Sequence, residues 1–368
     1  MDKQNLVDAE EKRQRIIGYL DRTGCDALIL GRQDNFSWYT GGGTNKVIIT
    51  SELGCAALLF TREQVYLVAY SMDANRILDE EMPGFAVEPV IMKWHEGEIF
   101  DKAMSLQKGK RIVADVSISG AQNVCGDIYK LHFPLMPREI EKLKQLGTTT
   151  EQIIKKVALE IRPGMVDYEI EAMLLYEYGR INAIPEVILV GLDERIPSYR
   201  HCIPRGKKVK NMVLLHPALR KDGLHANVAR TVCFEEMNPE ISRRYDAAYE
   251  ILAATVASCR RGAKFFDIHQ GIKAGMAEKG FADEWEKHFV GGASGYMLVD
   301  SSVNADDTFE VSGRHAFDWF ITITGAKVEE LIVVDDEKTI VTSVGGEWPS
   351  KEYLVDGDII VLPQIMLR

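Results

Sequence analysis

The chain has 368 residues, of which 46% are hydrophobic and 27% charged, a composition typical of a soluble globular protein with room for two domains. Its formal net charge of −11 argues against nucleic acid and anionic membranes as partners, because both attract proteins mainly through lysine and arginine. No CxxC pair, signal peptide or bilayer-length apolar run is present, so we expect a cytoplasmic protein without structural zinc or disulfides.

The first third of the chain predicts a compact α/β domain over residues 1–131. Short apolar runs bounded by turn residues indicate strands, and apolar residues at helical spacing indicate helices. The expected elements are helices at 9–24 and 73–82, strands at 25–30, 46–51, 55–61, 64–70 and 111–116, and a glycine turn within 35–45. The triple glycine at 41–43 lacks both the strand–GxGxxG–helix context and a GK[ST] sequence, so we interpret it as a tight turn rather than a phosphate loop.

Residues 132–368 predict a second domain of α+β class, with helices on one side of a curved, largely antiparallel sheet. Helices are expected at 133–147, 151–165, 166–182, 241–259 and 265–280. Strand-forming segments are expected at 187–192, 212–219, 223–234, 286–299, 315–336, 338–343 and 358–367.

The stretch HPALRKDGLHANVART (216–231) has the pattern of a β-hairpin that turns at KDG. Alternation along the strands, with a turn at 220–223, brings His216 across from Asn227 or His225. The surrounding residues are mostly apolar, which predicts that these polar side chains are buried and need partners. The alternative is a polar sheet face in contact with solvent.

This hairpin resembles the metal-binding hairpin of the creatinase/prolidase/methionine-aminopeptidase family, whose catalytic domain has the pita-bread fold. The resemblance extends over nearly the whole chain. Residues 1–131 are similar to the family's N-terminal domain, and PREIEKLKQLGTTTEQIIKKVALEIRPGMVDYEIEAMLLYE is similar to the opening helices of its catalytic domain. YRHCIPRGKKVKNMVLLHPAL is similar to the segment in which a substrate-contacting histidine precedes the first ligand strand. The resemblance implies a pita-bread second domain and a homodimer.

Active metallopeptidases of this family bind two metal ions through two Asp, one His and two Glu side chains. The resemblance places at these positions, in order, His216, Asn227, Gly292, Phe320 (with Asp318 two residues before it) and Glu329. Two neighbouring divalent ions need carboxylates to offset their repulsion, so we expect no dinuclear centre and no other cofactor. The alternative is a single divalent ion held by His216, Glu329 and His225.

Other residues of this region can transfer protons without a metal, as in creatinase, the metal-free hydrolase of the family. His201, in RHCIP, matches the substrate-contacting histidine, and we expect it to act as general acid or base, with His225 and Glu329 as further catalytic residues. The expected substrate-binding residues are His216, Asn227, Arg230, His288 and Tyr296. A structural, hydrogen-bonded role is the alternative for each.

Three functions are compatible with these residues. The first is a metal-independent hydrolase or lyase that acts on a small amide or amino-acid-like molecule. The second is a non-catalytic protein that binds a small molecule or peptide in the same cavity. The third is an Xaa-Pro aminopeptidase or dipeptidase with a degenerate single-metal site. All three require a small molecule or short peptide as partner.

Overall fold

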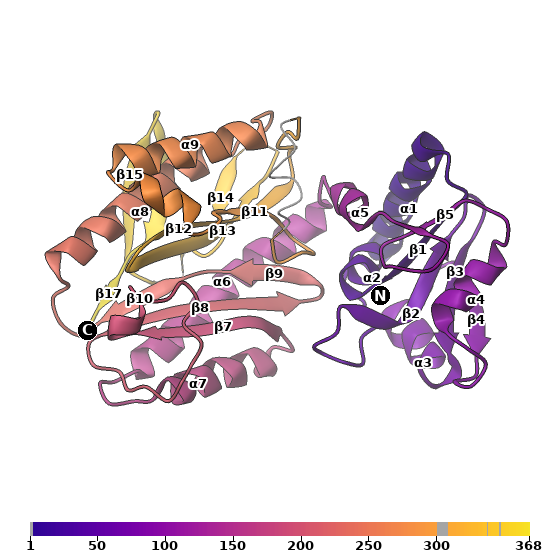
Figure 1. Cartoon of the computed structure of the whole chain (residues 1–368), viewed down its shortest axis with the longest axis horizontal. Coiled ribbons are helices and arrows are strands. Elements are labelled where there is room, and N and C mark those ends of the chain that lie inside the picture. The colour runs from indigo at the N-terminus through magenta and orange to yellow at the C-terminus, as the bar shows by residue number, and fades with distance from the viewer. Residues whose placement is uncertain (1–2, 300–307, 337, 346) are drawn as a thin grey trace. The chain divides into compact units, whose positions relative to one another are not determined.

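The computed structural model describes residues 3–299, 308–336, 338–345 and 347–368. The chain forms two compact units, Met1–Phe133 and Pro134–Arg368 (Figure 1). Each has its own sheets and its own buried apolar residues. Within the described residues, no helix is both long and apolar enough to cross a membrane.

The first unit is a mixed β-sheet with helices packed against it. Its elements are α1 (Lys3–Thr23), β1 (Ala27–Arg32), α2 (Gln33–Thr40), β2 (Leu53–Phe60), β3 (Val65–Tyr70), α3 (Ser71–Arg76), the π-helical turn η1 (Ile77–Glu81), β4 (Glu88–Met92), α4 (Ile99–Leu106), β5 (Ile112–Ala114), β6 (Gln122–Asn123) and α5 (Cys125–Leu131). The strand order is β4-β3-β2-β1-β5-β6, antiparallel among β1, β2 and β3 and parallel elsewhere. The expected α/β class is confirmed.

Two local predictions for this unit are wrong. The expected strand at 46–51 consists of bends and turns outside the sheet, and its apolar side chains Val47, Ile48 and Ile49 are exposed instead of packing in the core. The expected turn within 35–45 begins as helix α2, which ends at Thr40. Gly41 closes that helix with a φ of 71°, in the left-handed region that glycine adopts without strain, so the turn at the triple glycine itself is confirmed.

The second unit has the α+β class that the sequence predicts. Its elements are α6 (Pro137–Glu160), α7 (Asp167–Arg180), β7 (Ile184–Leu192), η2 (Asp193–Arg195), β8 (Met212–Lys221), β9 (Leu224–Asn227), β10 (Arg230–Cys233), α8 (Pro239–Ser258), α9 (Phe265–Glu278), η3 (Ala282–Glu286), β11 (Gly291–Ser294), β12 (His315–Ile323), β13 (Ala326–Val334), β14 (Thr339–Val341), β15 (Ser350–Val355), β16 (Asp358–Pro363) and β17 (Met366–Leu367).

Two sheets form the centre of this unit. One has the order β17-β10-β8-β7, with β9 also paired to β8, and the other has the order β11-β12-β13-β14. Helix α7 packs on β7, α6 on β9, and α8 on β12 and β13 (Figure 1). The sheets meet where the amide of Ala229 donates a hydrogen bond to the carbonyl oxygen of Glu329, 3.1 Å away. This junction brings side chains of β8, β9, β12 and β13 together.

The two faces of β12 differ in character. On one face, the rings of Phe317 and Trp319 pack around Phe265 of α9 and form part of the buried core. Because side chains alternate along a strand, Asp318 and Phe320 point to the opposite face, toward the junction of the sheets. Burial of the aromatic face therefore directs Asp318 and Phe320 toward the junction of the sheets.

The predicted hairpin is present, but its register differs from the expected one. A two-residue turn joins β8 and β9, and both of its residues have positive φ angles, 50° and 79°, as a type I′ turn requires. This turn pairs Asn227 with Ala218 and His225 with Arg220. The prediction that His216 lies across from Asn227 or His225 is therefore wrong, although alternation keeps His216 on the same face as both.

Helix α6 runs unbroken from Pro137 to Glu160, where the sequence predicts two helices separated near Gly147. This glycine lies against the segment after β14. A Cβ atom at Gly147 would lie 2.1 Å from Oγ1 and 2.9 Å from the carbonyl carbon of Thr342. The absence of a side chain thus permits close contact between helix and strand, and that contact keeps the glycine helical.

A pair of glycine substitutions tests this contact. Gly147→Ala is expected to lower the free energy of unfolding by about 1–3 kcal/mol, because the helix must move away from Thr342. Gly179→Ala in α7 is the matched control, since its Cβ would meet nothing within 4 Å. Alanine there should raise the free energy of unfolding by about 0.5–1 kcal/mol. Urea unfolding measures both, and equal stability of the two variants would contradict the close approach.

Candidate active site

A buried cluster of three polar side chains lies at the junction of the sheets. The Nζ atom of Lys327 lies 2.8 Å from Oε2 of Glu329 and 3.1 Å from Nδ1 of His216. Nε2 of His216 lies 3.0 Å from Oε1 and 2.9 Å from Oε2 of Glu329. All three residues are buried, so each charge is paired rather than hydrated.

The protonation states of Glu329 and His216 follow from these contacts. Burial raises the pKa of Glu329, but His216 and Lys327 outweigh burial and hold it at about 2, so the carboxylate is ionised at neutral pH. Burial also lowers the pKa of His216, which keeps its imidazole neutral. A neutral ring has one N–H and one lone pair, so Nε2 donates to Glu329 and Nδ1 accepts from the ammonium of Lys327. The cluster is therefore a fixed ammonium–carboxylate pair bridged by an imidazole.

The ring of Phe320, on the neighbouring strand β12, contacts the Lys327 ammonium. It is paired with Glu329 across β12 and β13, and Nζ of Lys327 lies 4.8 Å from the centre of its ring. An ammonium over an aromatic face is attracted by the negative face of the ring. The residue at the position where the family has a glutamate thus contacts the cation.

A second buried pair lies next to this cluster. Nδ2 of Asn227 donates to Oδ2 of Asp318 at 2.8 Å and to the carbonyl oxygen of Leu298 at 3.2 Å. Asp318 is paired in register with Gly292 across β11 and β12. It therefore contacts Asn227, at one position of the expected ligand set, and lies beside Gly292, at another. Burial, followed by the charge of Glu329, raises the pKa of Asp318 well above its ordinary value. Burial and the neighbouring Glu329 carboxylate therefore both favour the protonated form of Asp318.

A pair of histidines lies at the exposed side of the cluster. Nε2 of His288 is 3.3 Å from Nε2 of His201, and Nδ1 of His288 is 2.7 Å from the carbonyl oxygen of Phe289. Burial and the charge of Lys327 lower the pKa of both histidines, that of His288 to about 4. Because a carbonyl only accepts, Nδ1 of His288 carries its hydrogen and Nε2 accepts from His201. This leaves Nδ1 of His201 with a lone pair.

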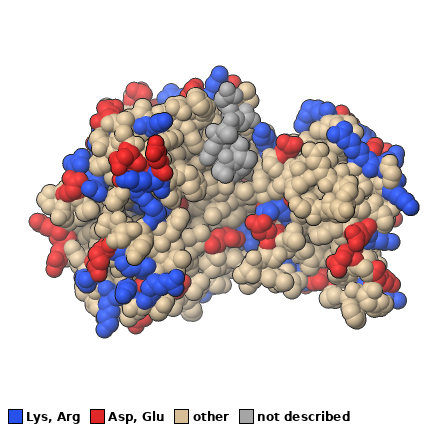
Figure 2. Space-filling model, in the orientation of Figure 1, with Lys and Arg blue, Asp and Glu red and all other residues tan. Residues whose placement is uncertain are grey.

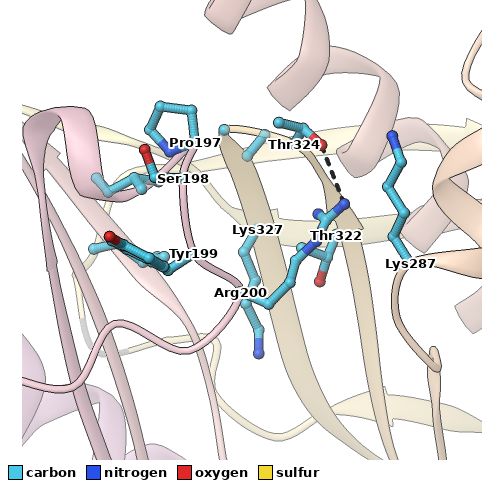
Figure 3. A pocket seen from close by; sticks show the side chains of 12 residues that line it. Pro197, Ser198, Tyr199, Arg200, Lys287, Thr322, Thr324 and Lys327 are labelled. Atoms are coloured by element: carbon cyan, nitrogen blue, oxygen red, sulfur yellow. Dashed lines mark hydrogen bonds between the residues drawn. The ribbon is translucent and has the colours of Figure 1, made fainter.

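A pocket of about 210 Å³ lies beside these residues (Figure 3). It is lined by residues 196–200, Leu214, Lys287, Thr322, Thr324, Gly325, Ala326 and Lys327. Lys327 belongs both to the pocket wall and to the buried cluster. Across the pocket, Nη2 of Arg200 donates to Oγ1 of Thr324 at 3.1 Å.

Three of the expected site residues have other hydrogen-bond partners. Nδ1 of His225 donates to the carbonyl oxygen of Gly295 at 3.0 Å, and burial lowers its pKa to about 3. The other two bond to buried acids: Arg230 forms an ion pair with Glu330, with Nη1 2.7 Å from Oε1, and the Tyr296 hydroxyl donates to Oε1 of Glu139 at 2.8 Å. The structure thus brings together His201, His216, Asn227, His288 and Glu329, and it gives His225, Arg230 and Tyr296 structural contacts.

Sequence reasoning did not identify Lys327 and Arg200, and it treated Asp318 only as a neighbour of the ligand position. One signal was present, because a lysine inside the apolar strand AKVEELIVV must be buried and therefore needs a partner. Within the described residues, no group of three or more His, Cys, Asp and Glu side chains is arranged to hold a metal ion.

Comparison with known proteins places this arrangement in a family. Methionine aminopeptidase of Helicobacter pylori (strain J99 / ATCC 700824) is 23% identical over 156 residues, 39% of this chain and 60% of that protein, so the match spans less than two thirds of this relative. An Xaa-Pro dipeptidase from Bacillus anthracis has a similar structure, with a TM-score of 0.76, 17% identity, and coverage of 98% of this chain and 100% of the other.

The N-terminal domain of the FACT complex subunit SPT16 from Cicer arietinum (chickpea) also has a similar structure, with a TM-score of 0.70 and 12% identity over 92% of this chain and 96% of that one. At such identities the structural likeness shows the fold, which is the pita-bread arrangement expected for the second unit. The family model described as metallopeptidase family M24 matches residues 141–335, more than half of the chain. This protein therefore belongs to metallopeptidase family M24.

Proposed function

We propose that this chain is a metal-independent hydrolase that cleaves a C–N bond in a small amide or amino-acid-like substrate. The observation that supports this most directly is the position of Lys327. Its ammonium lies within 3.1 Å of both His216 and Glu329, the residues at the first and last ligand positions of the family. A positive charge that belongs to the chain is thus already paired with the ionised carboxylate of the site.

The donor set does not fit two divalent ions. The Asn227 side chain is neutral, Gly292 has no side-chain donor, and the Phe320 ring cannot coordinate, so bridging carboxylates are missing. The single-ion alternative also loses support, because His225 lies opposite Arg220, about 13 Å along β8 from His216. Its Nδ1 is hydrogen-bonded to the backbone as well.

The proposed reaction uses the lone pair on Nδ1 of His201 as general base. His201 takes a proton from water, and the hydroxide attacks the amide carbonyl. The Lys327 ammonium offsets the negative charge that forms on the carbonyl oxygen. When the C–N bond breaks, protonated His201 returns the proton to the leaving nitrogen, so the imidazole is neutral again after each turnover. His288, which accepts from Nε2 of His201, fixes the orientation of the ring.

A His201→Ala variant tests the catalytic role. We expect kcat/KM on a panel of N-acyl amino acids and Xaa-Pro dipeptides to fall by about 10²–10⁴-fold, the usual effect of losing a general base. In the unaltered protein, kcat/KM should rise with pH through a pKa below the ordinary histidine value of 6.5. His95→Ala, at an exposed histidine of the first unit, is the control and should leave kcat/KM unchanged.

Chelation and elemental analysis test whether the activity depends on a bound metal ion. Activity that survives dialysis against EDTA, with less than one equivalent of bound Mn, Co, Zn or Fe, is the expected result. Near two equivalents of metal, or activity restored only by Mn or Co, would replace the proposal with a metal-dependent Xaa-Pro peptidase.

A second candidate is a non-catalytic binding protein. The fold is shared with a protein whose name describes a subunit of the FACT complex rather than a peptidase, and every charge of the buried cluster is already paired within this chain. A substrate panel that shows no turnover by the unaltered protein, together with ligand binding that His201→Ala does not change, would favour this candidate.

A further inference from the structure

A buried carboxylate outside the cluster joins several segments around the candidate site. Glu284, in the short helix η3, is only 5% exposed. It accepts hydrogen bonds from Nζ of Lys287 at 2.9 Å, from the amide of Thr324 at 3.0 Å and from Nη2 of Arg200. The Thr324 hydroxyl donates to Oε1 of Glu284 at 2.8 Å and accepts from Nη2 of Arg200 at 3.1 Å (Figure 3). The proposed reaction uses none of these contacts.

The Glu284 carboxylate is ionised, and its acceptor positions are occupied. Burial raises its pKa, but hydrogen bonds from Arg200, Lys287 and Thr324 outweigh burial and hold the pKa at about 2. A carboxylate has about four acceptor positions, and four donors meet this one. Acidic and basic side chains are interspersed on the surface drawn in Figure 2, where ion pairs contribute little. Glu284 differs from them because a buried charge that loses its partners is costly.

Two of the donors are the direct neighbours of the paired histidines. Arg200 precedes His201 in the chain, and Lys287 precedes His288. Both histidines lie in irregular segments, one between η2 and β8 and the other between η3 and β11. Such segments are the ones that open most easily, because helical or sheet hydrogen bonds do not hold their backbone. The contact between the two Nε2 atoms, at 3.3 Å, therefore needs another anchor, and both neighbours bond to the same carboxylate.

The third donor residue ties these segments to the sheet. Thr324 begins the turn between β12 and β13, and Lys327 lies on β13. Both the amide and the hydroxyl of Thr324 bond to Glu284, so the two irregular segments are held against this pair of strands as well as against one another. One carboxylate thus links the histidine pair to the strand that carries the buried ammonium.

We propose that Glu284 is a positioning residue, which holds His201 and His288 in the spacing and the tautomers that the proposed base requires. The proposal rests on the proposed function for its catalytic meaning. Glu284 acts through Arg200 and Lys287 rather than on the substrate. Placement matters because a general base works only within hydrogen-bond reach of the proton that it removes.

A Glu284→Gln variant tests the charge, because it keeps the shape of the side chain. An amide has one acceptor oxygen and a nitrogen that only donates, so it cannot serve four donors. Nitrogen-15 labelling of the eight histidines, followed by long-range proton–nitrogen correlation NMR at pH 7, reports the tautomer of each ring. His201→Gln and His288→Gln assign the two signals.

The contacts predict which tautomers the unaltered protein contains. His288 should be the Nδ1–H form and His201 the Nε2–H form, because the hydrogen bond of one ring nitrogen sets the state of the other. In Glu284→Gln we expect the loss of both single forms, with each ring exchanging between its two tautomers. Rings that already exchange in the unaltered protein would overturn the positioning role.

Kinetics give a second measurement where an amide of the panel is cleaved. Glu284→Gln should lower kcat by about 10²-fold, as for a misplaced catalytic group, and change KM by less than about 3-fold. A higher KM with unchanged kcat would overturn the positioning role, because it would mean that Glu284 serves substrate binding instead.

Two further variants serve as control and as safeguard. Glu286→Gln removes the same charge from an exposed position of the same helix, and it should leave the tautomers and kcat unchanged. Lys287→Met releases only the segment of His288, from a side chain that is 44% exposed, so the fold should remain intact. His288 should lose its single tautomer in this variant too.

The outcomes separate this inference from the proposed hydrolase. Loss of the tautomers in Glu284→Gln, with no amide cleaved by the unaltered protein, would support the anchor and refute only the hydrolase. Unchanged tautomers in Glu284→Gln would overturn the positioning role, even where His201→Ala abolishes hydrolysis. If circular dichroism shows that Glu284→Gln does not fold, Lys287→Met decides, and an unchanged His288 signal there would overturn the role. The same changes in Glu286→Gln would also overturn it, since they would reflect loss of charge in general.

Discussion

Replacing Lys327 with methionine is expected to lower the free energy of unfolding by about 3–5 kcal/mol, as measured by urea unfolding at pH 7. The substitution leaves the Glu329 carboxylate buried without its ammonium partner. Methionine fills nearly the same volume, so the loss reports the charge rather than a cavity. Lys279→Met, at a partly exposed lysine paired with Glu250, should change the free energy of unfolding by less than about 1 kcal/mol.

A double variant separates the pair from the individual residues. Lys327→Met combined with Glu329→Gln removes both charges and leaves an amide oxygen that can still accept from His216. More than half of the stability lost in Lys327→Met should return, because a neutral buried pair no longer includes an uncompensated charge. A double variant as unstable as the single one would show that the ammonium–carboxylate pair is not the reason for the loss.

Stability should fall steeply as the pH is lowered from about 6.5 toward 4. Burial lowers the pKa of both His225 and His315 to about 3, whereas an unfolded chain binds these protons near pH 6.5. The unfolded state therefore holds more protons between these values, and stability present above pH 6.5 is lost as the pH falls. At pH 5 the loss is on the order of 2 kcal/mol for each histidine.

The pH slope is the quantity to measure. Urea unfolding at pH 7, 6 and 5, followed by tryptophan fluorescence, gives the free energy at each pH. His315→Gln should reduce the stability lost between pH 7 and pH 5 by about 2 kcal/mol, even where it lowers stability at every pH. His95→Gln, at an exposed position, should leave the slope unchanged. A slope that is the same in His315→Gln and the unaltered protein would mean that His315 is protonated in the folded chain.

Much of the fold could be predicted from local patterns. The strands at β1, β2, β3 and β8 and the helices at α7, α8 and α9 follow from apolar periodicity and from glycine and proline signals. The errors arose where tertiary contacts decide. The apolar run at 46–51 has strand composition but pairs with no strand of the sheet and leaves its side chains exposed. Gly147 suggests a helix end but lies in a close contact between α6 and Thr342.

The sequence and its family resemblance indicated where the candidate site lies, but not all of the side chains that form it. The family resemblance pointed to His216, Asn227 and Glu329, and all three lie at the junction of the sheets. His225 was expected beside His216, but the two-residue turn sets a register that pairs it with Arg220. Lys327 could not be assigned a partner, because its contact with His216 joins strands more than a hundred residues apart. Such contacts follow from the register between sheets, which no local pattern encodes.

The ammonium of Lys327 has a chemical consequence for the whole site. A cation attached to the chain needs no uptake from the cell and is not removed by a chelator, so its occupancy is independent of supply. An ammonium has no vacant orbital, however, and acts only through its charge and its N–H donors. It cannot bind a water molecule as a Lewis acid and make it acidic. In the proposed reaction, deprotonation of water therefore falls to a side-chain base, and the histidine pair at the exposed side of the cluster is suited to that task.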